Sequence, residues 1–101
     1  MQIPAYRGRD NKEQIAFVQD GEPLNFNAAG VTAASVLVNG ETLAAEITGT
    51  NNNVISFKPG GLTLRPGIYD AFVVVTSPDD PAGKVIAGPG QVVNLSVKVL
   101  L

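Results

Sequence analysis

Glycine and proline divide this sequence into short segments, and their spacing is the strongest constraint on its fold. The chain has 11 Gly and 7 Pro among 101 residues, and they recur at short intervals from Gly21 to Gly90. The runs between them are too short for ordinary α-helices. These runs are rich in Val, Ile, Phe, Tyr and Thr, and several alternate apolar with polar residues at a period of two. The sequence therefore predicts an all-β chain.

The Asn39-Gly40 dipeptide is the clearest hairpin signal in the chain. It separates two strand-like runs, residues 31–38 and 42–48. A type I′ turn needs positive φ at both central residues, which Asn and Gly tolerate best. Residues 43–46 individually favour a helix over a strand, and they are the weak point of this prediction.

Further strands are predicted at residues 13–19, 54–58, 68–76, 84–87 and 91–101, with shorter ones near 24–26 and 62–64. The run at 68–76 is apolar on both faces, which favours a central strand covered on both sides. About seven short strands in a chain of this length predict an antiparallel, immunoglobulin-like two-sheet sandwich. Parallel sheets need helical crossovers, and none is evident. We expect one such domain at residues 12–101, preceded by an N-terminal arm at residues 1–11.

Charged residues are sparse, at 16% of the chain, against roughly 25% in typical soluble domains. A surface with few charges fits either a small neutral domain or a protein that buries much of its surface in an assembly. The net charge is −2, and the one basic cluster is Arg7 and Arg9, followed at once by Asp10. Phosphate binding needs clustered Lys and Arg, so nucleic acid is not an expected partner.

No apolar run reaches the length of a signal peptide or of a membrane span. We therefore expect no membrane partner, and synthesis and folding in the cytoplasm.

The residue types that most often carry catalysis are missing or isolated. The chain has no His and no Cys, and none of its serines lies in a Gly-x-Ser-x-Gly elbow. Asp79 and Asp80 could bind Ca²⁺, but their spacing matches no calcium-binding loop, so a solvated turn is the better interpretation. Glu41 and Glu46 are five residues apart in a predicted strand and should face opposite sides. We expect a non-enzymatic protein without cofactor or metal.

The two chain ends offer the candidate partner interface. Residues 97–101 are apolar up to Leu101, and such a strand end needs cover from the core or from a neighbour. The opening segment could likewise add to the sheet edge of a partner. Ordinary packing within the domain and a role in assembly both remain open. The candidate interface residues are Ile3, Tyr6, Arg7, Arg9, Leu100 and Leu101.

Four stretches of the chain carry a family resemblance: Arg7-Gly8-Arg9-Asp10, then Gln19-Asp20-Gly21-Glu22-Pro23-Leu24, then Gly30-Val31-Thr32, and Leu64-Arg65-Pro66-Gly67-Ile68-Tyr69 before an apolar strand. In this order they resemble the immunoglobulin-like modules of tailed-phage structural proteins, for instance those at the N-terminus of baseplate upper proteins. The resemblance covers most of the chain.

The resemblance implies a bacteriophage virion structural protein that acts by protein–protein assembly. Its partners would be major capsid, tail or baseplate proteins, or further copies of itself, and its location would be the virion. Baseplate and fibre proteins continue into long downstream segments, whereas this chain stops where the sandwich is complete. We therefore expect a capsid decoration or cement protein, or a small head or tail accessory. The alternatives are a fibre-attachment module of the tail or baseplate and a carbohydrate or cell-surface binding module.

Overall fold

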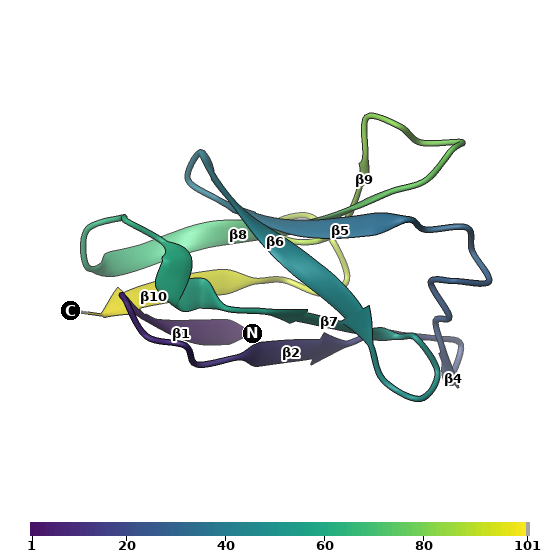
Figure 1. The fold of residues 1–101 in the computed structure, drawn as a ribbon, viewed down its shortest axis with the longest axis horizontal. Coiled ribbons are helices and arrows are strands. Elements are labelled where there is room, and N and C mark those ends of the chain that lie inside the picture. The colour runs from purple at the N-terminus through teal and green to yellow at the C-terminus, as the bar shows by residue number, and fades with distance from the viewer. Residues whose placement is uncertain (101) are drawn as a thin grey trace.

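The computed structural model describes residues 1–100, and almost all of its regular structure is β-strand (Figure 1). The expected all-β fold is confirmed. The described residues form ten strands and one 3₁₀ turn. They are β1 (Gln2–Tyr6), β2 (Glu13–Ala16), β3 (Val18–Gln19), β4 (Glu22–Pro23), β5 (Ala33–Val38), β6 (Glu41–Thr48), β7 (Val54–Phe57), η1 (Pro59–Gly61), β8 (Gly67–Thr76), β9 (Lys84–Ala87) and β10 (Ser96–Leu100).

Eight of these strands form one sheet. Its order is β1-β10-β8-β5-β6-β7-β2, and β9 pairs with β8 beside this path. The sheet curls until it is nearly closed into a barrel, and β1 and β2 are its two edges (Figure 1). The remaining strands, β3 and β4, form a separate small hairpin. In the part of the chain described, no helix is long and apolar enough to span a membrane.

The predicted hairpin at Asn39-Gly40 is confirmed. Both residues have positive φ, 46° and 85°, and β5 and β6 pair across them from Val38 and Glu41 onward. Residues 43–46 lie in β6 although they favour helices. Leu43 and Ala45 are half-buried and alternate with exposed neighbours, so contact with the core outweighs local propensity.

The central position predicted for residues 68–76 is also confirmed. On one side β8 pairs with β5, and on the other it pairs first with β10 and then with β9. Ala71, Val73 and Val75 are buried in the core, while Phe72 and Val74 are half-buried on the opposite face.

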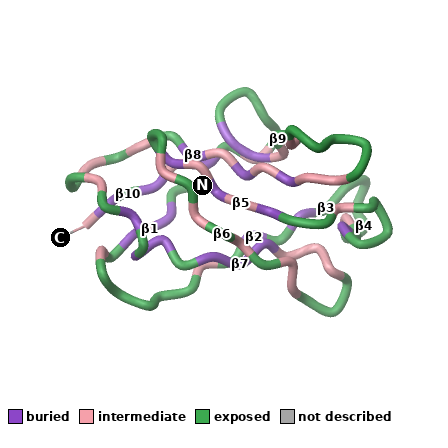
Figure 2. The backbone as a smooth tube through the Cα atoms, turned by 45° about the horizontal axis from the view of Figure 1, so that its top comes forward, coloured by how far each residue is buried: buried purple, intermediate pink, exposed green. Residues whose placement is uncertain are grey.

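The buried apolar side chains form one core, which lies between the curled strands, while the connecting loops are largely exposed (Figure 2). Strands from both ends of the sheet contribute to it. The buried apolar residues are Ile3, Ala5, Ile15, Phe17, Phe26, Ala34, Val36, Val38, Ile55, Phe57, Leu62, Ala71, Val73, Val75, Ala87, Leu95, Val97 and Val99.

The predicted N-terminal arm at residues 1–11 is wrong for its first half, because Gln2–Tyr6 forms β1 inside the sheet. Ile3 and Ala5 are buried, and the Met1 ammonium donates a hydrogen bond to the Asn94 carbonyl oxygen, at 2.9 Å. The two buried side chains alternate with exposed or half-buried neighbours, which is the pattern of a strand packed on one face.

The prediction of a wholly antiparallel fold is wrong at the same place, since β1 runs parallel to β10. No helical crossover is needed, because the whole of the domain lies between these two strands in the sequence. Three other boundaries differ. Of the predicted strand at 91–101, residues 91–95 form no strand and β10 covers Ser96–Leu100; the expected strand near 24–26 lies at Glu22–Pro23; and residues 62–64 form no strand. Phe26 is instead anchored in a loop by its amide, which donates to the Asn52 carbonyl oxygen at 2.9 Å.

Candidate functional site

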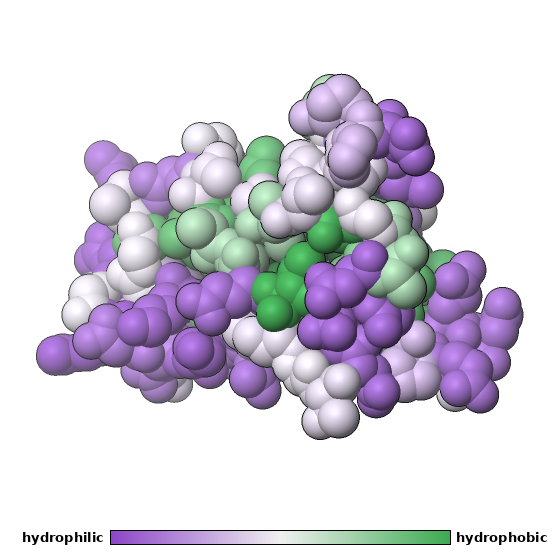
Figure 3. Space-filling model, turned by 45° about the vertical axis from the view of Figure 1, so that its right-hand side comes forward, coloured by the Kyte–Doolittle hydropathy of each residue, from purple (hydrophilic) through white to green (hydrophobic). Residues whose placement is uncertain are grey.

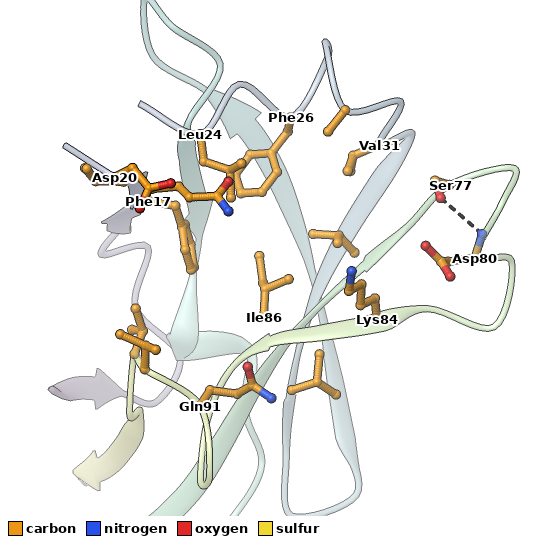
Figure 4. Close-up of a pocket in the computed structure, with 17 residues that line it drawn as sticks. Phe17, Asp20, Leu24, Phe26, Val31, Ser77, Asp80, Lys84, Ile86 and Gln91 are labelled. Atoms are coloured by element: carbon orange, nitrogen blue, oxygen red, sulfur yellow. Dashed lines mark hydrogen bonds between the residues drawn. The ribbon is translucent and has the colours of Figure 1, made fainter. Parts of the chain in front are cut away.

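A groove of about 640 Å³ opens at one end of the molecule, and we call it the loop groove (Figures 3 and 4). Two stretches far apart in the sequence build it, residues 17–31 and residues 75–93. Its apolar lining residues are Phe17, Val18, Leu24, Phe26, Ala29, Val31, Val75, Val85, Ile86, Val92 and Val93, and its polar ones are Gln19, Asp20, Ser77, Asp80, Lys84 and Gln91.

Residues 17–31 form one wall, and a pair of phenylalanines fixes it. The rings of Phe17 and Phe26 meet edge to face, with centroids 5.6 Å apart and planes at 71°. The Phe17 amide donates to the Asn53 carbonyl oxygen at 2.8 Å, and the Leu24 amide donates to the Phe17 carbonyl oxygen at 3.1 Å. These bonds hold the wall against the loop between β6 and β7.

Strand β9 and residues 91–93 form the opposite wall. Ile86 points from β9 into the groove, toward the side that carries Phe17 and Leu24 (Figure 4). The Gly88 amide donates to the Val93 carbonyl oxygen at 2.8 Å, which closes this segment into a compact loop. In residues 1–100, β9 pairs with β8 alone, so its outer edge has no strand partner.

The rim of the loop groove exposes apolar side chains to solvent. Val18, Val85 and Val92 are 63%, 40% and 104% exposed. Figure 3 shows hydrophobic residues gathered in the middle of this end, with hydrophilic residues around them. An exposed apolar patch that is surrounded by polar residues is typical of a surface that binds another molecule.

The hydroxyl of Ser77, at the loop groove, takes part in a local turn. The Asp80 amide donates to Ser77 Oγ at 3.1 Å, so this hydroxyl caps its own turn. Asp79 and Asp80 lie in that turn. Among the residues described, no three His, Cys, Asp or Glu side chains come close enough to hold a metal ion. The chemistry that this end offers is therefore apolar contact bordered by charge.

The interface residues predicted from the sequence lie elsewhere, and the structure brings four of them together. Tyr6 is the register partner of Leu100, the Arg7 amide donates to the Leu100 carbonyl oxygen at 3.3 Å, and the Arg9 amide donates to the Tyr6 carbonyl oxygen at 3.1 Å. Ile3 is only 4% exposed, so its predicted place in an interface is wrong. Leu101 lies outside the described residues.

This second end carries most of the basic side chains. Arg7 is half-buried, and its Nη1 donates to the Leu64 carbonyl oxygen at 3.1 Å. Lys58 Nζ lies 3.9 Å from an Asp10 carboxylate oxygen, and both side chains are exposed. Such an exposed pair contributes little to stability.

Two hydrogen bonds at this end change the pKa of Glu41. Its carboxylate accepts hydrogen bonds from the Thr63 hydroxyl and from the Thr63 amide, the latter at 2.7 Å. The hydroxyl bond and then the amide bond lower the pKa of Glu41 below 4.5, because both favour the charged form. Glu41 therefore stays anionic to lower pH than a Glu without these two hydrogen bonds.

The sequence interpretation missed the loop groove. A signal was present, since Val18, Leu24, Val92 and Val93 are apolar residues that lie beside turns. The sequence pattern alone does not show that residues 17–31 and 75–93 meet at the same end of the molecule.

No family model, no curated protein and no solved structure matches this chain.

Proposed function

We propose that this protein is a non-enzymatic structural component of a tailed-phage particle, in which it acts by binding other proteins of the particle. The single observation that carries the binding role is the loop groove, with Val18, Val85 and Val92 exposed along its rim. The assignment to a phage particle depends on the resemblance of the sequence to the immunoglobulin-like modules of phage structural proteins.

An immunoglobulin-like arrangement is part of the proposal, and the order of the strands supports it. Without β3, β4 and β9, the seven remaining strands can be lettered A to G in chain order. The sheet then reads A-G-F-C-D-E-B, which contains the C-F-G and B-E-D groups of an immunoglobulin sandwich. Strand β6 links the two groups, because its first residues pair with β5 and its last with β7.

This lettering also supports a binding role for the loop groove. Residues 17–31 lie in the connection from B to C, and residues 77–93 lie in the connection from F to G. In antibody variable domains the B–C and F–G connections lie at the antigen-binding end. In this lettering the loop groove lies at the corresponding end. Its lining is mostly apolar, whereas the contacts of antibodies are more polar.

The apolar character of the loop groove favours a protein partner over a carbohydrate. Sugar-binding sites usually offer an exposed aromatic ring, but Phe17 and Phe26 are buried behind the groove wall, at 5% and 2% exposure. Tyr6 is exposed, yet it lies at the opposite end. Within the particle, the positions that we propose are capsid decoration or cement and small head or tail accessory.

The test is cosedimentation of the fluorescently labelled protein with purified heads and, separately, purified tails of the phage that encodes it. Val18→Asp places a charge in the groove rim, and Ile68→Asp is a matched control, because Ile68 is also 63% exposed but lies outside the groove. We expect wild type and Ile68→Asp to cosediment with one of the two, and Val18→Asp to lose at least about 90% of that binding.

Two results would count against the proposal. A wild-type protein that binds neither heads nor tails would refute a place in the particle. Equal binding by Val18→Asp and Ile68→Asp would refute the loop groove as the contact surface. Circular dichroism of both variants checks that each is folded, since both side chains are exposed in the wild type.

A further inference from the structure

Charge is segregated along the long axis of this molecule. The domain measures 38 × 26 × 23 Å, and the β1–β2 connection lies at the opposite end of its longest dimension from β4 and the chain that leads into β5, which belong to the segments that build the loop groove (Figure 1). Exposed charged residues at the loop-groove end are four acids and one base, which gives a net charge of −3. They are Asp20, Glu22, Asp79, Asp80 and Lys84.

The opposite end, which we call the basic end, has the reverse sign. It consists of the β1–β2 connection, the β7–β8 connection and the first residues of β2 and β6. Hydrogen bonds join these segments: the Gly8 amide donates to the Gly60 carbonyl oxygen, and Thr63 donates to Glu41. Five bases and three acids give a net charge of +2 there. They are Arg7, Arg9, Lys12, Lys58 and Arg65, with Asp10, Glu13 and Glu41.

We propose that copies of this protein associate head to tail, with the basic end of one copy seated on the loop groove of the next. The contact joins two different surfaces, so it is heterologous, and repeating it produces a ring or an open row of copies. This inference depends on the proposed function, and it names the neighbour that the loop groove contacts as a second copy of this chain.

Charge complementarity decides the orientation of this contact. Two loop-groove ends facing each other would bring together two surfaces of −3, and two basic ends would also repel. The head-to-tail arrangement alone places opposite signs in contact, and such complementarity steers encounter and fixes the register of an interface. Most of the charges responsible are exposed to solvent, where ions screen them, so the association should depend on salt.

Apolar side chains at both ends would be buried in this contact, and their burial would add to the attraction between the charges. The loop groove offers Val18, Val85 and Val92, and the basic end offers Tyr6, which is 37% exposed, and half-buried Leu100. Tyrosine with arginine beside it is a composition enriched in protein interfaces. The predicted interface residues Tyr6, Arg7, Arg9 and Leu100 thus become one half of the contact, and the loop groove becomes the other.

Variants of the full chain with exchanged charges test the proposal, and sedimentation measures their self-association. The variant Asp79→Lys/Asp80→Lys makes both ends basic, and Arg9→Glu/Lys12→Glu makes both ends acidic. Each alone should weaken self-association at least about tenfold relative to wild type. An equimolar mixture of the two should associate again, since every head-to-tail contact between the two different variants joins opposite charges. The control Asp70→Lys changes the net charge in the same direction as the first variant, at an exposed position of β8 that pairs with Ser96 of β10, and should associate like wild type.

Ionic strength provides the second measurement. Wild type should sediment as oligomers at about 10 mM salt, where the Debye length is about 30 Å, and as monomers at about 1 M, where it is about 3 Å. The proposal is overturned if wild type stays monomeric at low salt, if the mixture fails to associate, or if the control loses association. A monomeric wild type that still binds heads or tails through Val18 would overturn this inference and leave the proposed function standing.

Discussion

Ile3 of β1 and Val97 of β10 are register partners in the parallel pair that these two strands form, and both side chains are buried. The first strand in the sequence is thereby fixed to the last one. Beyond β1, the chain reverses through residues 7–12 and enters β2 at the other edge of the curled sheet. The N-terminal segment therefore contributes to the core and, through Tyr6 and Arg7, shapes the basic end.

Replacing Ile3 by Ala should destabilise the domain by about 2–4 kcal/mol, because it removes a buried aliphatic side chain and leaves a cavity. Gln2→Ala is the control, since Gln2 precedes it in β1 and is exposed. We expect the control to change the free energy of unfolding by less than about 0.5 kcal/mol. Urea unfolding followed by circular dichroism measures both. If Ile3→Ala and Gln2→Ala lowered the free energy of unfolding by the same small amount, residues 2–6 would not be held in the core.

Gly60→Ala should be strongly destabilising, because a Cβ at this position would lie 2.0 Å from the Arg9 carbonyl oxygen and 2.8 Å from the Tyr6 carbonyl oxygen. Both obstacles are backbone, so the β1–β2 connection would have to move and lose the bond from the Gly8 amide. Overpacking of this kind costs about 1–3 kcal/mol or more.

The neighbouring Gly61 supplies the control for this substitution. A Cβ there would meet only Leu43 Cδ2, at 3.2 Å, the end of a side chain that can shift. Thermal unfolding of the two alanine variants should therefore give a clearly lower melting temperature for Gly60→Ala. If Gly61→Ala melted at the same temperature or below, the close approach of residues 6–9 to η1 would be refuted.

Local signals in the sequence were sufficient to predict the strands in which apolar and polar residues alternate clearly and which end at turns. Asn39-Gly40 predicted its hairpin because the required positive φ is a property of those two residues. Strand β8 was placed at the centre of the sheet because both of its faces are apolar. Strand β1 was missed because its five residues include Pro4, and its partner is the last strand of the chain, which no local pattern reveals.

The sequence pattern draws attention to residues near the chain ends but does not predict the loop groove. Tyr6, Arg7, Arg9 and Leu100 were chosen for their place near the chain ends, and the pairing of β1 with β10 does bring them together. The loop groove brings together residues more than 50 positions apart in the sequence, such as Phe17 and Ile86, which both line it. The separation of charge between the two ends has the same origin, since acids and bases are interspersed along the sequence.

The titration of Glu41 should respond to Thr63. The hydroxyl of Thr63 is the largest cause of the lowered pKa, so Thr63→Val, which keeps the amide, should raise the pKa of Glu41 toward 4.5. The folded pKa lies below the unfolded value, so this interaction stabilises the domain above about pH 4.5, and the stabilisation is lost as pH falls through the folded pKa. The carboxyl carbon shift of Glu41 in an NMR titration measures this. An unchanged pKa in Thr63→Val would exclude the hydroxyl as the cause.

The edge-to-face pair of Phe17 and Phe26 should be energetically coupled, because the two rings meet at 5.6 Å and 71° and are buried together. We expect a double-mutant cycle of Phe17→Leu and Phe26→Leu to give a coupling energy of about 0.5–1.5 kcal/mol in chemical denaturation. A cycle of Phe26→Leu with Leu62→Ala is the control, since Leu62 is equally buried but lies beside η1 at the basic end. That cycle should be additive within about 0.5 kcal/mol. Because the ring pair fixes one wall of the loop groove, Phe26→Leu should also weaken binding to heads or tails while the chain remains folded. Coupling that is no larger in the first cycle than in the second would show that the two rings do not act as a unit.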